Sequence, residues 1–253
     1  YRGEDVTVVT ATASGKTLCY QVPVLDSILK DSRATTLYLA PLNALVEDQL
    51  GAFSSIDDTG RDWEHVVRKD DRNKYYRRLM VDGRMVKICR YDGGVPYNFR
   101  RAIWEVQPNI VITNPEMLHR SILSWSDDKH WKYLLENLRF VVIDELHTYK
   151  GIFGSSFANL MRRLRRLCHY LGASPQFICA SATISNPGDL AQDLTGRPHT
   201  VVSHDGAPRK LRRFVLWDAT RSEDAINTDA KNLMQRLVGG HRIKTLTFSR
   251  SIP

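Results

Sequence analysis

Hydrophobic positions along the first two hundred residues follow two alternating periods. Short apolar runs rich in β-branched residues predict buried strands, and longer segments with apolar residues every three or four positions predict amphipathic helices. The predicted strands cover residues 6–9, 35–39, 86–91, 109–112, 139–143 and 176–179. The predicted helices cover residues 18–29, 42–53, 99–106, 115–122, 129–137, 155–171 and 187–194.

Strands that alternate with helices indicate an α/β fold, with a parallel sheet covered by helices on both faces. The amino-acid composition changes at residue 206, where a connector rich in basic residues begins. A strand over 214–217, a helix over 225–238 and a strand over 245–248 follow it. The pattern therefore predicts one domain over residues 1–205 and the incomplete start of a second over 206–253.

Several details of these elements are specific enough to test. Four apolar residues share one face of the first predicted helix: Leu18, Val22, Leu25 and Leu29. Pro23 lies inside that helix and predicts a kink or break near Gln21, because proline disrupts a regular helix interior. The charged segment over residues 72–81 is compatible with a helix. Ser155 or Ser156 is expected to cap the long helix that follows them.

Composition narrows the class of protein. The 253 residues are 42% hydrophobic, and no apolar run approaches the length of a membrane span, so none is predicted. A net charge of +8 suits a polyanionic partner, although charge alone is weak evidence. The cysteines lack metal-ligand spacing, and Cys168 and Cys179 fall in apolar patterns. We expect a reduced, cytoplasmic protein, and the abrupt ends suggest a fragment of a longer chain.

The strand at 6–9 leads into a small-residue turn and then directly into a helix. Such a turn lets backbone N–H groups close around phosphate oxygens at a helix N-terminus. Lys16 is expected to reach the β- and γ-phosphates of a nucleotide, and Thr17 to bind Mg²⁺. The strict motif has glycine where this chain has Thr10, and an ordinary helix-capping turn is the alternative. The predicted ATP-binding residues are Thr12, Ala13, Ser14, Gly15, Lys16 and Thr17.

A second candidate site follows the strongly apolar strand at 139–143. In nucleotide hydrolases an aspartate at this position orients Mg²⁺, and a glutamate activates the attacking water. Asp144 and Glu145 occupy these positions here. An acidic pair at a strand end means little alone, but both carboxylates would emerge at the sheet edge that carries the phosphate loop. The predicted catalytic residues are therefore Lys16, Asp144 and Glu145.

The order of the motifs resembles that of superfamily-2 helicases. SGKT, APLNALVEDQ, the Asp-Gly-Gly turn, TNPEML, VVIDELH, SAT and TLTFSRS follow one another as motifs I, Ia, the Gly-Gly turn, Ib, II, III and IV do in that superfamily. Four longer segments are similar to those of the mitomycin-repair-type bacterial DNA helicases: TATASGKTLCYQVPVLDSI, ITNPEMLHRSIL, VVIDELHTYKGIFGS and ICASATISNP. The likeness covers most of residues 6–195 and the motif near residue 248.

This resemblance implies roles for further residues and a RecA-like fold for both domains. Residues that would couple hydrolysis to nucleic-acid binding are His147, Ser181 and Thr183. Residues that would line the strand-binding groove are Pro41, Asn43, Gly93, Gly94, Thr113, Pro115, Ser249 and Arg250. Relatives carry Thr and a basic residue where this chain has Leu42 and Asn43, which leaves a phosphate contact at position 43 open.

Two groups of basic residues allow two interpretations. Arg162, Arg163, Arg165 and Arg166 are expected to form a solvated helix face, with DNA contact as the alternative. For Arg209, Lys210, Arg212 and Arg213 in the connector the two interpretations are evenly balanced.

The sequence thus predicts an ATP- and Mg²⁺-dependent motor on single-stranded nucleic acid. The resemblance implies DNA, 3′→5′ travel, and a setting in repair or in defence against foreign DNA, with possible protein partners there. An RNA helicase is one alternative, and a nucleotide-gated nucleic-acid-binding subunit that does not unwind is another. We expect residues 1–253 alone to hydrolyse ATP poorly, because the arginines that stabilise the transition state would come from the rest of a second domain.

Overall fold

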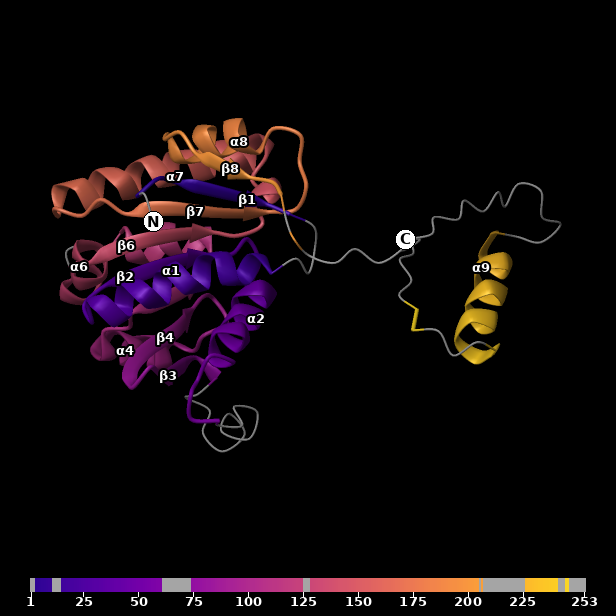
Figure 1. Ribbon diagram of the computed structural model, residues 1–253, viewed down its shortest axis with the longest axis horizontal. Helices are drawn as coiled ribbons and strands as arrows, with labels where there is room; N and C mark the ends of the chain where they lie inside the picture. Colours follow the sequence, from indigo (N-terminus) through magenta and orange to yellow (C-terminus); the bar gives the residue numbers. More distant parts are fainter. Residues whose placement is uncertain are drawn as a thin grey trace. The chain divides into compact units, whose positions relative to one another are not determined.

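An eight-stranded sheet organises the first of two compact units, residues 1–207 and 208–253. The computed structural model describes residues 3–10, 15–60, 74–124, 128–204, 206, 226–240 and 244–245. The strand order is β3-β4-β5-β2-β6-β7-β1-β8 (Figure 1), and every neighbouring pair is parallel except antiparallel β3–β4. The strands are β1 (Val6–Val9), β2 (Thr35–Leu39), β3 (Tyr76–Val81), β4 (Arg84–Tyr91), β5 (Ile110–Thr113), β6 (Leu138–Ile143), β7 (Gln176–Ser181) and β8 (Thr200–Val202).

Helices cover both faces of this sheet and bury two separate hydrophobic clusters against it. One face carries α1 (Lys16–Lys30) and α2 (Asn43–Ser54). The other carries α4 (Tyr97–Val106), α5 (Pro115–Met117) with a π-helical turn over Leu118–Ile122, α6 (Lys129–Glu136), α7 (Gly151–Tyr170) and α8 (Pro187–Thr195). The predicted α/β class with a covered parallel sheet is therefore confirmed.

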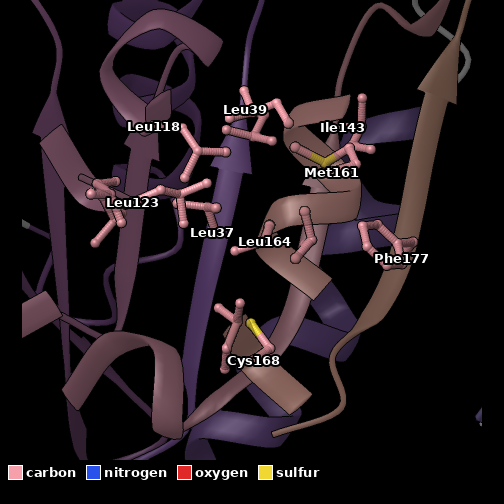
Figure 2. Packing of buried hydrophobic residues seen from close by; sticks show 14 of the residues in the cluster. Leu37, Leu39, Leu118, Leu123, Ile143, Met161, Leu164, Cys168 and Phe177 are labelled. Atoms are coloured by element: carbon pink, nitrogen blue, oxygen red, sulfur yellow. The ribbon is translucent and has the colours of Figure 1, made fainter. Parts of the chain in front are cut away.

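Strand β2 shows how the sequence builds this two-sided core. All five of its residues are buried, and successive side chains point to opposite faces. Leu37 and Leu39 pack in the cluster that includes Met161 and Leu164 of α7 (Figure 2), whereas Tyr38 belongs to the cluster under α1 and α2. A strand buried on both faces reads as a continuous apolar run, as it does here.

The first helix differs from its prediction in two ways. Leu18 and Val22 are 61% and 56% exposed, because the buried face is instead formed by Tyr20, Val24, Leu25 and Ile28. Burial of a tyrosine removes more apolar surface than burial of the predicted leucine. The helix also continues without a break through Pro23, so of the kink or break expected near Gln21 the break is excluded.

Two further expectations are corrected. Residues 76–81 of the segment expected to be helical form strand β3, which pairs with β4. Helix α7 begins at Gly151, so Ser155 lies inside it and donates its hydroxyl to the Gly151 carbonyl at 3.2 Å instead of capping the helix. The short edge strand β8 was not predicted. Cys168 and Cys179 are buried core residues, as expected.

The second unit is described over a helix and two further residues. Helix α9 (Ile226–Gln235) continues in a π-helical turn over Arg236–Gly240, close to the predicted helix at 225–238. The strand predicted at 214–217 lies outside the described residues, as does most of that at 245–248. The identity of this unit as the start of a second RecA-like domain stays a prediction. Within the described ranges, no helix combines the length and apolar character of a membrane span.

Candidate functional site

The predicted site residues gather at one edge of the sheet, where the parallel strands end. The loops after β4 and β5 carry Gly93 and Asn114, and Asn43 begins α2, after the loop that follows β2. The loops after β6 and β7 carry Asp144 and Thr183, and α1 with Lys16 follows the loop after β1. Because strand order runs β4-β5-β2-β6-β7-β1, the edge has two halves that meet between β2 and β6. We call these the groove half and the phosphate half.

Helix α1 begins in a way that leaves its N-terminus open to an anion. Gly15 takes the left-handed conformation (φ 86°, ψ 17°) at the N-cap, and no side chain in the described part of the chain caps the first turn. Backbone N–H groups at such an N-terminus have no helical partners and favour negative charge. Thr12, Ala13 and Ser14 of the predicted ATP-binding loop lie outside the described residues.

Lys16 joins the two motifs that flank the phosphate half. Its ammonium Nζ donates to the carbonyl oxygens of Thr10, after β1, and of Ser181, at the end of β7, at 3.1 Å each. Both acceptors are neutral, so neither cancels the positive charge. The Ser181 hydroxyl beside them is buried and has no hydrogen-bond partner among the described residues. This is the kind of unsatisfied group that a bound ligand can engage.

The acidic pair lies at the end of β6, and β7 separates that strand from β1, which leads to Lys16. The backbone N–H of Asp144 donates to the Leu39 carbonyl at 2.9 Å, which extends the β2–β6 ladder by one residue. Its carboxylate accepts from Tyr38 through Oδ2 and from the backbone N–H of Glu145 through Oδ1, the latter at 2.9 Å. Each carboxylate oxygen therefore keeps a lone pair for water or a metal ion.

Glu145 is held in an uncommon backbone conformation. Its φ of 49° and ψ of 47° are left-handed, which costs a residue with a Cβ roughly 1–2 kcal/mol. Thr148 stabilises this conformation, because its backbone N–H and its hydroxyl both donate to the Glu145 carbonyl, at 2.9 and 2.8 Å. His147 Nδ1 lies 3.2 Å from Glu145 Oε2, although the two atoms are not aligned for a hydrogen bond. Such strain concentrates at functional sites.

The groove half contains a cavity of about 420 Å³. Its lining residues are Asn43, Gly93, Arg100, Asn114, Glu116, Met117, Arg120 and Ser121. Asn114 Nδ2 donates to Asn43 Oδ1 at 2.7 Å, and Arg100 donates to the Gly93 carbonyl at 3.0 Å. The first contact joins motifs Ia and Ib, and the Gly-Gly turn lines the same cavity.

A buried ion pair stabilises the Gly-Gly turn. Arg90 Nε lies 2.6 Å from Asp92 Oδ2, and the Asp92 side chain is completely buried. Asp92 Oδ1 also accepts from the backbone N–H of Gly94 at 2.7 Å. Arg90 further contacts Glu47 of α2 at 2.9 Å. The turn is thereby fixed to both its own strand and the neighbouring helix.

The other predicted residues differ in how far their side chains are exposed. Thr113 is fully buried and donates its hydroxyl to the Tyr91 carbonyl, and Pro115 is buried at the start of α5. Pro41 is half-buried and Thr183 is exposed. The predicted contacts Ser249 and Arg250 and the connector residues Arg209, Lys210, Arg212 and Arg213 lie outside the described residues.

Six of the cavity-lining residues were not among the predicted contacts: Arg100, Asn114, Glu116, Met117, Arg120 and Ser121. The available signal was the position of the two arginines, because each lies in the helical segment that directly follows a predicted contact motif. The arginine row of α7 is only partly a solvated face. Arg163 donates to the Leu123 carbonyl at 2.8 Å, and Arg165 donates to the Thr195 carbonyl at 3.0 Å.

Comparison with known proteins places this geometry in a family. The sequence model described as "DEAD/DEAH box helicase" matches residues 1–190. The "Uncharacterized ATP-dependent helicase YprA" of Bacillus subtilis is 39% identical over 99% of this chain and 31% of its own length. "ATP-dependent helicase HRQ1" of Saccharomyces cerevisiae is 34% identical over 98% of this chain and 22% of its own length.

A solved structure gives the same result in three dimensions. The DUF1998 helicase MrfA bound to DNA and AMPPNP is 37% identical, with a TM-score of 0.71 over 94% of this chain and 30% of that chain. The present chain thus spans about a third or less of the relatives that it matches. The predicted resemblance is confirmed at the level of the family, the RecA-like fold and the MrfA-like branch. This chain belongs to the DEAD/DEAH box helicases of superfamily 2 and resembles their mitomycin-repair-type members.

Proposed function

We propose that the chain is the first motor domain of an ATP-dependent DNA helicase or translocase. The observation that carries the proposal is the pair of sites on one sheet edge: the Lys16 and Asp144 half for a nucleotide, and the cavity beside Asn43 and Gly93 for a nucleic-acid strand. Since the two halves meet between β2 and β6, hydrolysis at one can alter binding at the other.

The phosphate half fits a magnesium nucleotide in its chemistry. The uncapped start of α1 suits the phosphates, as does the Lys16 ammonium, which among the described residues contacts neutral carbonyls only. Thr17 and Asp144 would hold Mg²⁺, an ion that prefers oxygen ligands. Bound there, Mg²⁺ would offset the negative charge of the phosphates.

The chain's own acid and hydroxyl groups would supply the remaining chemistry. Glu145 would take a proton from the attacking water, which is the role of a general base. His147, Ser181 and Thr183, on the loops after β6 and β7, would relay the state of this half to the groove. The tight hold on the Glu145 backbone by Thr148 supports a fixed position for that base.

The groove half suits contacts that are blind to base sequence. Backbone groups around Pro41, Gly94, Thr113 and Pro115, with the Asn43 and Gly93 positions, would hold phosphates of a single strand. The solved MrfA complex with DNA favours DNA over RNA for this chain. We further propose 3′→5′ travel, a cytoplasmic setting and a role in DNA repair or in defence, with protein partners there.

The direct test is ATP turnover by the full-length protein with and without nucleic acid. We expect single-stranded DNA to stimulate turnover more than RNA of equal length. Glu145→Gln is expected to lower turnover by about a hundredfold or more while nucleotide and DNA binding remain. Unchanged turnover in this variant would refute the assigned base, and turnover that neither nucleic acid stimulates would refute the motor.

A further inference from the structure

Two buried tyrosines lie where the phosphate half and the groove half meet. Tyr20 comes from α1 and Tyr38 from β2, and they are 2% and 0% exposed. Their ring centroids are 5.4 Å apart and the planes meet at 61°, an edge-to-face contact. A buried phenol hydroxyl needs a hydrogen-bond partner, so the partners of these two define what the pair connects.

The first partner is the metal-binding carboxylate of the proposed site. Tyr38 donates its only hydrogen to Asp144 Oδ2, while Oδ1 accepts from the backbone of Glu145. With a separate donor on each oxygen, the carboxylate cannot rotate without breaking a hydrogen bond. Hydrogen bonds to a charged acceptor are among the stronger ones in proteins. Tyr38 therefore fixes the orientation in which Asp144 meets a ligand.

The second partner lies on the helix that leads away from the groove. The Tyr20 hydroxyl donates to Gln49 Oε1 of α2 at 2.9 Å and lies 3.5 Å from Tyr38 Oη. The Tyr38 hydroxyl donates to Asp144 Oδ2. The two tyrosines, which contact each other through their rings, therefore link α2 to the carboxylate.

Burial raises the pKa of Tyr20 to about 12, against opposing hydrogen bonds from Thr17, Tyr38 and Gln49. Burial and the nearby Asp144 charge raise the pKa of Tyr38 as well. The Thr17 contribution also ties Tyr20 to the proposed second metal-binding residue.

Helix α2 carries the connection to the groove. Gln49 lies six residues after Asn43, about 9 Å along the helix axis. Asn43 starts α2, lines the 420 Å³ cavity and accepts from Asn114 at 2.7 Å. A displacement of α2 when a strand binds would therefore pull on Gln49, and through the tyrosines on Asp144.

We propose that Tyr38 is a positioning residue for Asp144, and that the Tyr20–Tyr38 pair couples the nucleotide site to α2 and its nucleic-acid groove. This inference rests on the proposed helicase function. It assigns the coupling to a physical element with two ends: a carboxylate that meets the nucleotide's metal ion and a helix that meets the strand. Residues acting through such an element change the link between two sites more than either site alone.

The experiment compares Tyr38→Phe, Tyr20→Phe and Gln49→Met in the full-length protein, with Tyr149→Phe as the matched control. Tyr149 is also a fully buried tyrosine near Asp144, but its hydroxyl has no hydrogen-bond partner among the described residues. For Tyr38→Phe we expect the Mg²⁺ concentration at half-maximal turnover to rise about tenfold. Nucleotide affinity measured in EDTA is expected to stay unchanged, which a general folding defect would not allow.

For Tyr20→Phe and Gln49→Met we expect the ratio of DNA-stimulated to basal turnover to fall several-fold, with Tyr149→Phe matching the wild type. If Tyr38→Phe does not fold, Gln49→Met decides, because Gln49 is half-buried on the surface of α2. Wild-type turnover without DNA stimulation would refute the helicase function itself. Stimulated wild-type turnover, together with variants that behave like Tyr149→Phe, would refute only the coupling role.

Discussion

Gly15 is a position where the backbone, and not a lack of space, requires glycine. An added Cβ would meet nothing within 4 Å, but φ is +86°. Alanine pays roughly 1–2 kcal/mol in this region and relaxes by turning the first peptide units of α1. Those units carry the N–H groups that the proposed nucleotide site depends on, so the strain would appear in binding.

We therefore expect Gly15→Ala to weaken nucleotide affinity about tenfold or more in a titration with a fluorescent ATP analogue. Gly51→Ala is the matched control, since its Cβ is equally unobstructed but lies inside α2 without a positive φ. This control is expected to bind normally and to gain about 0.5–1 kcal/mol in stability. Equal affinity in the two variants would contradict a role for the Gly15 conformation.

Much of the site was predictable at the level of single residues, because local sequence carries the signal. Lys16 and Asp144 each follow an apolar strand, and parallel strands end at one edge. Tyr38 carried no such signal. In the sequence Tyr38 is one of several consecutive apolar positions in a predicted strand. Its contact with Asp144 joins residues that are 106 apart in sequence. The left-handed conformation of Glu145 was equally invisible, since most residues there are glycine or asparagine.

Strand β8, which pairs with β1, is preceded by a half-buried histidine. His199, just before the strand, lies between two hydroxyls: Nδ1 is 3.0 Å from Thr7 Oγ1 and Nε2 is 2.9 Å from Thr195 Oγ1. Burial lowers the pKa of His199 below its ordinary 6.5, although Asp5 opposes that shift. The fold therefore favours the neutral imidazole, which bridges β1 and α8 at this edge.

The sign of the pH dependence follows from this lowered pKa. The unfolded chain binds a proton near pH 6.5 before the folded chain does, so the stabilisation is present above that pH and is lost as pH falls through the folded pKa. We expect His199→Gln to flatten the fall in unfolding free energy between about pH 7 and pH 5 in urea titrations. Exposed His204→Gln should keep the wild-type profile. Parallel pH profiles for wild type and His199→Gln would contradict the prediction.

The β3–β4 hairpin shows why one element was mispredicted. Its turn is Asp82-Gly83, with φ of 48° and 70°, the positive pair of angles that a two-residue hairpin loop requires. Leu79 and Val81 alternate inward, so the strand signal was present in the sequence. The density of charged residues before it obscured that signal. The buried face of helix α1 was mispredicted for a different reason. The helix has two apolar faces, and tertiary packing buries the one with Tyr20.

At the scale of the whole molecule, the positive charge is distributed over more than one surface. Arg100 and Arg120 line the cavity of the groove half, where Arg120 also contacts exposed Glu116 at 3.2 Å. Arg162 and Arg166 are exposed on α7, away from that cavity. The net charge of +8 includes both pairs equally. Net charge sets general attraction to a polyanion, whereas contact sites determine how many counterions are released on binding.

Substituting each pair in turn therefore distinguishes DNA binding in the groove from general electrostatic attraction. Arg100→Gln/Arg120→Gln and Arg162→Gln/Arg166→Gln each remove two charges. For single-stranded DNA, each lost phosphate contact lowers the slope of log affinity against log salt by about 0.7. We expect the first double variant to lose about 1.4 from this slope, measured by fluorescence anisotropy. The second should keep the wild-type slope and bind slightly more weakly at low salt. Equal slopes in the two variants would mean that the strand is held by general charge and not by the groove.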